Sequence, residues 1–354
     1  MKILHAADLH LDTAFTGRDP ESVSYLKRQL LAVPQKIGQL CQAYDCDLLL
    51  LSGDIFDAAA TAESLHAFKT ALATLQIPVC ISPGNHDFCA GNSPWLTETW
   101  PEHVHIFTQP IIQSISLPQL DCRIYGAGFT SMDCPPLLEQ FRAEGNETYH
   151  IGLLHGDPVQ RNSPYCPITQ SQVAASGLHY LALGHIHKAG SFTAGSTLCA
   201  WPGCPMGRGN DETGEKGVYL VELNETATAT FLPLDTPRFY DLEAEVLTSP
   251  EDALSALLPA VGSEDFYRIT FTGESVPFDL NALQRPEFPH LLLRDHTVPP
   301  ADLWGNIAED SLEGTLFRLL HEALENADAA QADDIQLSAR ICRRILDGRE
   351  VALP

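Results

Sequence analysis

The sequence predicts an α/β fold, and three observations lead to this class. Apolar runs of strand length recur along the chain, as in "KILHAAD", "DLLLLSGD" and "IPVCISPG". Segments with helical spacing of apolar residues separate the first three runs. The runs are apolar throughout instead of alternating with polar residues, which is typical of strands covered on both faces. We therefore expect a sheet covered on both faces, with functional residues in the loops beyond the strand ends.

Strands and helices are expected to alternate from the N-terminus. The first strand covers residues 3–7, and a helix with an apolar stripe follows at 23–44. A strand at 48–51, a helix at 62–75 and a strand at 77–81 continue the pattern. Further strands are expected in "YHIGLLHGD", in "YLALGHIH" and at 217–223. Together these elements predict a first domain at residues 1–234.

After residue 234 the predicted elements become sparser. Strand-like runs in "DTPRFYDLEAEV" and "FYRITFTG" flank a helical stretch at 250–260, which predicts a small α+β unit at 235–300. From Ser311 onward, apolar residues fall on one helical stripe, and a second stripe begins at Ile335, so residues 301–354 are expected to be helical. The alanine- and acid-rich segment 328–334 is expected to link the two helices. Such stripes form core or dimer contacts, or dock a partner.

The composition describes a folded and strongly acidic chain. Of the 354 residues, 44% are hydrophobic, and the formal net charge is −25, spread over both parts of the chain. Such a surface repels polyanions and offers no basic patch of the kind that nucleic-acid-binding proteins use. No apolar run approaches the roughly 20 residues of a membrane span, and no signal peptide precedes the first strand. We therefore expect a cytoplasmic protein with no membrane partner.

Two features that suggest other chemistry are better explained by structure. The ten cysteines are scattered without a CxxC pair, which predicts reduced core thiols instead of a disulfide framework or a zinc cluster. Cys199 and Cys204 have a spacing that could hold a metal, but no second Cys or His pair lies nearby. In "GNDETGEK", Lys216 comes one place too late for a P-loop and no Ser or Thr follows it, so the segment is expected to be a polar turn.

One pattern occurs five times along the chain. An apolar run ends in a glycine, a small residue or a turn, and Asp, His or Asn follows at once, in "ADLH", "GDIFD", "GNHD", "LHGD" and "GHIH". A single buried histidine is more often a packing residue than a ligand, but five such endings in succession indicate one shared site. The candidate ligands at these strand ends are Asp8, His10, Asp54, Asn85, His155, His185 and His187.

The ligand types in this set restrict the chemistry. Carboxylate, imidazole and amide oxygen suit Mn²⁺, Fe²⁺ or Zn²⁺ and are poor ligands for Cu⁺ or an iron–sulfur cluster. Seven ligands exceed what one ion takes from a protein while leaving room for substrate. Two divalent ions about 3.5–4 Å apart that share a carboxylate account for the number and form a clamp for displacement at phosphorus. His5 and His66 are expected to be structural, and Asp12 and Asp157 to be hydrogen-bonding or turn residues.

The order D-x-H, GD-x-x-D, GNHD, H-G-D and G-H-x-H resembles the calcineurin-like metallophosphoesterase superfamily over roughly residues 1–221. Within it, "HAADLHLD", "GDIFD" and "WPGCPMGRGNDETGEKGVYLVEL" look most like the SbcD-type DNA repair exonuclease subunits of a short bacterial branch. The resemblance implies a sandwich of mixed sheets flanked by helices, with a small α+β cap and C-terminal helices. In that family the cap contributes to a DNA-facing cleft, whereas the unit here is short and acidic.

The resemblance also implies a role for each residue. It assigns one metal to Asp8, His10 and His187, the other to Asn85, His155 and His185, and the bridging position to Asp54. His86 matches the histidine that stabilises the transition state or protonates the leaving oxygen. Asp57 is the candidate that orients His86, with Asp87 as the alternative. The nucleophile would be a water or hydroxide held between the metals.

The implied activity is metal-dependent hydrolysis of DNA phosphodiesters, as an exo- or endonuclease subunit in DNA repair. Two divalent ions, foremost Mn²⁺, are the expected cofactors. An SbcC-like SMC-type ATPase that binds the C-terminal helices is the expected partner, and a homodimer is a further expectation. Two alternatives stay open: a phosphatase or phosphodiesterase acting on a phosphoprotein or small nucleotide, and a non-catalytic scaffold with the same fold.

Overall fold

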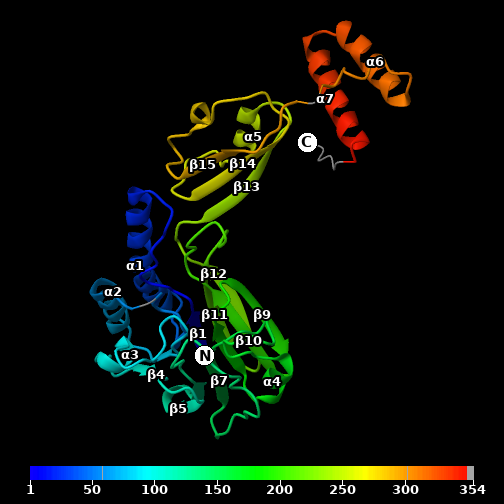
Figure 1. The fold of residues 1–354 in the computed structure, drawn as a ribbon. Coiled ribbons are helices and arrows are strands. Elements are labelled where there is room, and N and C mark those ends of the chain that lie inside the picture. Colours follow the sequence, from blue (N-terminus) through cyan, green and yellow to red (C-terminus); the bar gives the residue numbers. More distant parts are fainter. Residues whose placement is uncertain (58, 301, 349–354) are drawn as a thin grey trace. The chain divides into compact units, whose positions relative to one another are not determined.

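The computed structural model of the chain describes residues 1–57, 59–300 and 302–348. Its backbone divides into a first unit, Met1–Phe239, and a second unit, Tyr240–Pro354 (Figure 1). The predicted division into residues 1–234, 235–300 and 301–354 stays a prediction. No helix among the described residues is both long and apolar enough to cross a membrane.

Two six-stranded mixed sheets form the framework of the first unit. The first sheet consists of β1 (Lys2–Ala6), β2 (Leu48–Leu51), β3 (Val79–Ile81), β4 (Val104–Ile106), β11 (Gly217–Leu223) and β12 (Ala227–Pro233), in the spatial order β12-β11-β1-β2-β3-β4. Strands β1 to β4 run parallel to one another, whereas β11 and β12 are antiparallel additions at one edge.

The second sheet consists of β5 (Gln113–Leu117), β6 (Cys122–Gly126), β7 (Tyr149–His155), β8 (Tyr180–Gly184), β9 (Lys188–Ala194) and β10 (Thr197–Gly203), in the spatial order β5-β6-β7-β8-β10-β9. Strands β6, β7, β8 and β10 are parallel, and the two edge strands β5 and β9 are antiparallel to their neighbours. Both sheets are therefore mixed, which confirms the predicted sandwich of mixed sheets.

Helices cover the outer faces of the sandwich. They are α1 (Pro20–Ala43), α2 (Ala62–Ala73), α3 (Pro94–Thr97) and α4 (Gln170–Ala175), with a 3-10 turn at Pro118–Leu120. Figure 1 shows α1, α2 and α3 on one side of the strands and α4 on the other. Helix α1 begins before the expected residue 23 because Pro20 stands in its first turn and Asp19 caps it, accepting hydrogen bonds from the backbone N–H groups of Glu21 and Ser22.

The main core lies between the two sheets. Leu48 and Leu50 of β2 belong to the same buried cluster as Ile151 and Leu153 of β7. Because side chains alternate along a strand, Leu49 of β2 points to the opposite face. The expectation of a sheet covered on both faces is therefore confirmed, with the second sheet as the cover of one face. A fully apolar run shows only that both faces are buried, and a second sheet buries a face as well as a helix does.

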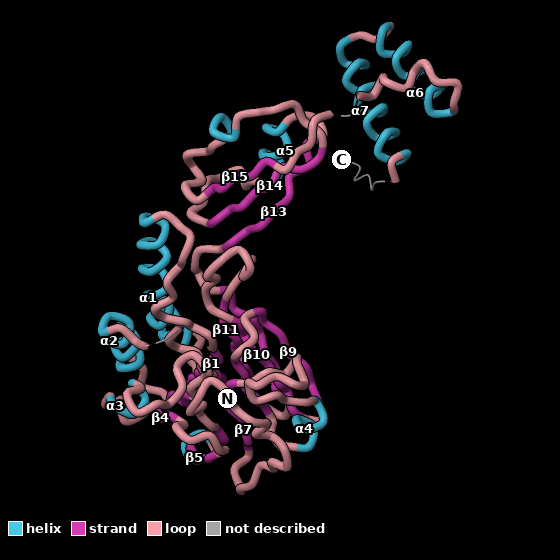
Figure 2. The backbone as a smooth tube through the Cα atoms, viewed as in Figure 1, coloured by secondary structure: helices cyan, strands magenta, loops and turns pink. Residues whose placement is uncertain are grey.

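The second unit combines a small sheet with helices (Figure 2). Strands β13 (Phe239–Val246), β14 (Phe266–Gly273) and β15 (Leu291–Asp295) lie in that order, accompanied by α5 (Pro250–Leu257) and a 3-10 turn at Leu280–Leu283. β13 begins with the last residue of the first unit. A separate cluster of buried residues, including Ile269 and Phe271, forms the core of this sheet. This is the α+β arrangement expected for the region after residue 234.

Two helices follow, α6 (Leu312–Glu325) and α7 (Ala329–Leu346). The expectation of a linker at 328–334 is wrong, because Asp328 caps α7 and forms a reciprocal capping box with Gln331. Arg343 of α7 donates to Glu313 of α6 at 2.5 Å, and its guanidinium lies 4.6 Å from the ring centroid of Phe317. Helix α7 therefore packs on α6 through an ion pair and a cation–π contact.

All ten cysteines are free, nine are buried, and Cys342 is half-buried. No cysteine belongs to a group of ligating side chains among the described residues. Nine of the ten thiols thus lie in the core, as the sequence predicted.

Candidate metal centre

The polar residues of the five motifs lie where parallel strands of both sheets end. Asp8 follows β1, Asp54 follows β2 and Asn85 follows β3 in the first sheet, whereas His155 ends β7 and His185 follows β8 in the second. The two sheets are joined at this point, because Nδ1 of the His155 ring donates to the backbone carbonyl of Ser52 at 2.9 Å. The fold thus delivers residues from five strand ends to one place.

The backbone at these strand ends adopts an unfavourable conformation. Asp8, His10, Asp54 and His185 have φ values of 53°, 46°, 51° and 94°, in a region that residues other than glycine rarely occupy. Hydrogen bonds from Asp8 N–H to the carbonyl of Gly53 at 3.0 Å and from His10 N–H to the carbonyl of Asp54 at 2.9 Å hold the turns. Such strain is found where a structure must aim side chains at a site.

The glycines of the motifs are needed for close packing around these ligands. A Cβ atom on Gly84 would lie 2.2 Å from Oδ1 of Asp54, and one on Gly53 would lie 2.5 Å from Nδ1 of His155. Gly53 also has a φ of 89°, which disfavours any side chain. The "GD" and "GN" parts of the motifs therefore have a steric cause.

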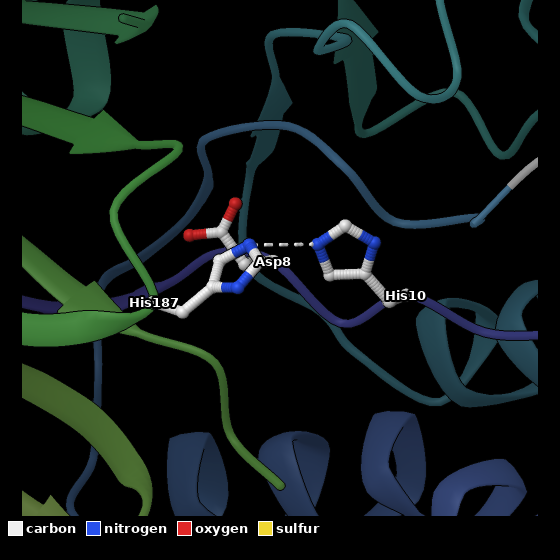
Figure 3. Close-up of side chains that lie close together, drawn as sticks. All are labelled: Asp8, His10 and His187. Carbon is white, nitrogen blue, oxygen red and sulfur yellow. Dashed lines mark hydrogen bonds between the residues drawn. The ribbon is translucent and has the colours of Figure 1, made fainter. Parts of the chain in front are cut away.

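One group of ligating atoms consists of Asp8, His10 and His187 (Figure 3). The Nε2 atoms of His10 and His187 face each other at 3.1 Å. Nδ1 of His10 lies 3.0 Å from Oδ1 of Asp57, and Nδ1 of His187 lies 2.7 Å from Oε1 of Glu212. Because a carboxylate only accepts hydrogen bonds, Asp57 holds the proton of His10 at Nδ1 and leaves its lone pair at Nε2. Nδ1 of His187 contacts Nη2 of Arg208 at 2.9 Å as well as Glu212, and its Nε2 atom faces that of His10.

A second group surrounds His155. Its Nε2 atom lies 3.0 Å from Oδ1 of Asn85 and 3.4 Å from Oδ2 of Asp54, and Nδ1 of His185 lies 3.3 Å from the same amide oxygen. Since Nδ1 of His155 already donates to the carbonyl of Ser52, its Nε2 presents a lone pair. Three kinds of acceptor atom thus converge here. Burial lowers the pKa of His185 to about 4 and keeps this ring neutral.

Asp54 lies between the two groups. Its Oδ2 atom is 3.8 Å from Nε2 of His10 and 3.4 Å from Nε2 of His155, while its Oδ1 atom accepts from the backbone N–H of His86 at 2.9 Å. Burial acts to raise the pKa of this carboxyl, but the neighbouring histidines lower it on balance, so Asp54 is ionised. A fully buried carboxylate that faces both groups has the placement of a bridging ligand.

Both groups have the donor chemistry of a cation site. Their nitrogen and oxygen lone pairs point at one another inside a buried region, and Asp8, His10, Asp54 and His155 are each at most 1% exposed. Acceptors in such an arrangement repel one another unless a positive charge lies between them. Two carboxylates, an amide and four imidazoles fit Mn²⁺, Fe²⁺ or Zn²⁺. The seven residues named from the sequence all belong to these two groups.

His86 lies at the edge of the centre and is more accessible, with 38% of its side chain exposed. Its Nδ1 atom is 3.1 Å from the backbone carbonyl of Asp57 and 3.3 Å from Oδ1 of the same residue. The hydrogen bond with Asp57 raises the pKa of His86 to about 9. An imidazole held in its protonated form beside a metal centre is equipped to give a proton to a leaving oxygen. A cavity of about 560 Å³ opens next to it.

Asp57 contacts two histidines at once. Oδ1 lies 3.0 Å from Nδ1 of His10 and 3.3 Å from Nδ1 of His86. Hydrogen bonds from these rings hold the pKa of Asp57 well below its usual range. Asp87, by contrast, accepts from the backbone N–H groups of Gly84 and Ile55 at 2.8 Å, and burial raises its pKa to about 7. Asp87 therefore shapes the "GNHD" turn.

Other polar residues near the motifs have structural contacts. Asp12 accepts from the backbone and hydroxyl of Thr61 and from the hydroxyl of Ser64, at the start of α2. Asp157 accepts from two backbone N–H groups of the following turn. His5, with no exposed surface, bonds the hydroxyls of Tyr180 and Ser52 at 2.7 Å each. The expectations for Asp12, Asp157 and His5 are confirmed.

The sequence did not indicate Glu212 and Arg208. Both lie in or beside the segment expected to be a polar turn, and Glu212 is only 8% exposed. Arg208 donates to Glu212 at 2.7 Å and lies 3.5 Å from Oδ1 of Asp57. These hydrogen bonds, with that of His187, outweigh burial and lower the pKa of Glu212 far below its usual value. Glu212 is therefore ionised and orients the ring of His187, while Arg208 contacts both Glu212 and Asp57.

The sequence model of the calcineurin-like phosphoesterase family matches residues 1–189. The chain belongs to this family and is thus a metallophosphoesterase, a hydrolase. All nine site residues inferred from the motifs lie within the matched residues, whereas Arg208 and Glu212 lie beyond them.

Three curated relatives are similar in sequence. An uncharacterized metallophosphoesterase of Bacillus subtilis, YhaO, is 34% identical over 63% of this chain and 57% of its own length. The chain thus spans less than two thirds of that relative. The SbcD component of the SbcCD nuclease of Bacillus subtilis is 23% identical over 65% of this chain and 68% of its own. A probable exonuclease subunit 1 of Escherichia phage T5 is 30% identical over 25% of this chain and 26% of its own.

Solved structures with a similar backbone include a dimetal phosphatase of Danio rerio, with a TM-score of 0.42, 13% identity, and coverage of 66% of this chain and 98% of that one. A putative 5'-nucleotidase of Staphylococcus aureus has a TM-score of 0.41 and 14% identity, and covers 66% of this chain and 54% of its own.

Proposed function

We propose that the protein is a two-metal phosphodiesterase that cleaves DNA as the nuclease subunit of a repair complex. The observation that carries the proposal is the convergence of buried lone pairs from five strand ends. The two Nε2 atoms of His10 and His187 face each other at 3.1 Å, and a second set of acceptors surrounds His155. The names of two relatives, a nuclease subunit and a probable exonuclease subunit, support DNA as the substrate.

The proposed ligands divide between two divalent ions, foremost Mn²⁺. Asp54 faces both groups and would bridge the ions. One ion would be held by Asp8, His10 and His187, and the other by Asn85, His155 and His185. A bound metal pair supplies an activated water and neutralises charge on the phosphate oxygens.

The chain's own residues would handle the proton of the leaving group. His86 is protonated at neutral pH and has an accessible ring, so it would donate to the oxygen that departs from phosphorus. Asp57 would hold Nδ1 of His86 through the contacts at 3.1 and 3.3 Å, which leaves Nε2 to face the substrate. Asp57 would also hold His10, and so would couple the proton donor to a metal ligand.

A partner would supply the positive surface that this chain lacks. The net charge of −25 opposes unaided binding to a polyanion. Helices α6 and α7 expose apolar side chains, with Leu312 at 88%, Leu319 at 60% and Ile345 at 60% exposed. These faces suit docking of an SbcC-like SMC-type ATPase by its coiled coil, or of a second copy of this chain. In this proposal the protein acts in the cytoplasm.

The direct test is hydrolysis of linear single- and double-stranded DNA beside bis-p-nitrophenyl phosphate, with Mn²⁺ titrated in. The proposal expects both substrates to be cleaved only with added metal. Cleavage of the small diester alone, also in the presence of an SbcC-like ATPase, contradicts DNA as the substrate.

The strong acidity favours a second candidate, a phosphatase or phosphodiesterase acting on a phosphoprotein or small nucleotide. Small substrates need no extended basic surface. Binding that neutralises several DNA phosphates weakens steeply with salt, so hydrolysis that is insensitive to ionic strength would favour this candidate. A non-catalytic scaffold predicts that the purified chain neither retains nor requires any divalent ion.

A further inference from the structure

A second cavity, of about 490 Å³, has His187 in its wall. Its walls come from the start of β9, the end of β10, the segment before β11, and β12, where the edges of the two sheets meet. His187 lines this cavity, and its Nε2 atom lies 3.1 Å from Nε2 of His10. The cavity and the candidate metal centre therefore share this residue.

Two lysines line this cavity in a chain that has few cations. Lys188 is exposed and begins β9, and Lys216, only 8% exposed, immediately precedes β11. Within the described part of the chain, no hydrogen bond or ion pair occupies the side chain of either lysine. The cavity beside the metal centre is thus lined by two available positive charges.

The carboxylates in the lining are largely engaged elsewhere. Glu212 accepts from Arg208 and contacts His187, both at 2.7 Å, and Glu215 pairs with Arg238 at 3.1 Å. Asp211 is the remaining acidic residue of the lining. The two lysines therefore outweigh the carboxylate charge that is left, and the cavity favours an anion despite the acidity of the whole chain.

The rest of the wall suits the organic part of a nucleotide. Tyr219 of β11 and Phe231 of β12 line the cavity, with their ring centroids 5.9 Å apart in an edge-to-face arrangement. Phe231 is half-buried, so part of its ring is accessible. An aromatic surface next to positive charge is the combination that binds single-stranded nucleic acid, by stacking of a base and pairing with a phosphate.

We infer that this cavity binds the nucleotide next to the scissile phosphodiester, with Lys188 and Lys216 holding its phosphate. The inference rests on the proposed nuclease function and extends it, because a subsite for a neighbouring phosphate distinguishes a polynucleotide strand from a small phosphoester. It also explains how an acidic chain can hold a DNA strand at its centre.

The test compares Lys188→Gln and Lys216→Gln with Lys27→Gln, which removes the same charge from an exposed position on α1. Binding of a fluorescein-labelled oligothymidylate is measured by anisotropy over a range of salt, in EDTA so that nothing is cleaved. Each cavity variant is expected to bind about tenfold more weakly than wild type, as for a lost hydrogen bond between charged groups. Each variant should also reduce the slope of the logarithm of the binding constant against the logarithm of the salt concentration by roughly 0.7.

A kinetic arm uses two substrates with Mn²⁺. We compare kcat/KM for a thymidine oligonucleotide with kcat/KM for bis-p-nitrophenyl phosphate. Their ratio should fall in Lys188→Gln and Lys216→Gln and should stay at the wild-type value in Lys27→Gln. Lys188 is exposed, so its variant keeps the test decisive if Lys216→Gln does not fold. If the cavity variants bind and cleave DNA as well as Lys27→Gln does, this inference is overturned and the proposed nuclease function is not affected. Wild-type protein that cleaves the small diester but neither binds nor cleaves oligonucleotide, also in the presence of an SbcC-like ATPase, overturns the nuclease function as well.

Discussion

The carboxylate of Glu212 lies 2.7 Å from Nδ1 of His187, at 8% exposure, and fixes the direction in which that ring presents Nε2. A carboxylate in this position sets the tautomer of a ligating histidine and increases its basicity. The first group of ligating atoms therefore depends on a residue that is not itself a ligand.

Replacement of Glu212 by Gln should lower the affinity for Mn²⁺ by about 10- to 100-fold, because the amide no longer fixes a neutral ring with its lone pair at Nε2. Isothermal titration calorimetry with metal-free protein measures the effect. Glu225→Gln is the matched control, since Glu225 is exposed in the turn between β11 and β12. Equal Mn²⁺ affinities in the two variants would show that Glu212 has no part in the site.

His86→Ala should reduce turnover by about 10²- to 10⁴-fold and leave the metal content unchanged, because His86 donates a proton without being a ligand in this account. Hydrolysis of bis-p-nitrophenyl phosphate and metal analysis of the same sample give the two readouts. His66→Ala, at an exposed position on α2, is the control. Loss of metal together with activity would make the role assigned to His86 wrong.

Asp57→Asn should weaken metal binding and reduce turnover at the same time. Asp57 contacts Nδ1 of His10 at 3.0 Å and Nδ1 of His86 at 3.3 Å, so its loss releases a metal ligand and a proton donor. We expect weaker Mn²⁺ binding and, at saturating Mn²⁺, turnover that remains about tenfold or more below wild type. Full recovery of turnover at saturating metal would mean that Asp57 acts on His10 only.

The buried His5 should make the fold sensitive to acid. Burial lowers its pKa from 6.5 to about 3 in the folded chain, so the unfolded chain takes up the proton first as the pH falls. The stability contributed by neutral His5 is fully present above pH 6.5 and is lost progressively between pH 6.5 and 3, by up to about 1.4 kcal/mol per pH unit.

Urea titrations of metal-free protein between pH 7 and 5 test this slope. His5→Gln should flatten the fall in the free energy of unfolding, while His66→Gln should retain it, because His66 is exposed. Some slope should persist in His5→Gln, since burial also lowers the pKa of His105 and His150. Parallel pH profiles for His5→Gln and wild type would contradict this account of His5.

The sequence was informative wherever a short-range pattern has a physical cause. An apolar run followed by Gly and Asp marks a strand end whose glycine is required by packing, as at Gly84, where a Cβ would approach Asp54 to 2.2 Å. Such endings allowed the seven candidate ligands that the fold brings together to be named before the fold was known. The helices at 62–75 and 250–260 were likewise anticipated within a few residues of their observed ends.

Long-range relationships could not be read in the same way. Glu212 is a single acidic residue in a polar turn, and only the folded course of the chain through β9 and β10 brings it to His187, 25 residues earlier. Hydrophobic pattern alone did not show that the strands divide into two sheets, since "LLLL" at β2 shows burial of both faces but not what buries them, and only the resemblance of the motifs implied the sandwich. Helix α7 begins within the acid-rich segment because Asp328 and Gln331 form a capping box at its N-terminus.

The central claim is that two ions share Asp54, and anomalous diffraction at the manganese edge from crystals grown with Mn²⁺ tests it most directly. The account predicts two peaks about 3.5–4 Å apart. One should touch Asp8, His10 and His187, the other Asn85, His155 and His185, and Asp54 should contact both. A single peak, or two peaks without Asp54 between them, would contradict it.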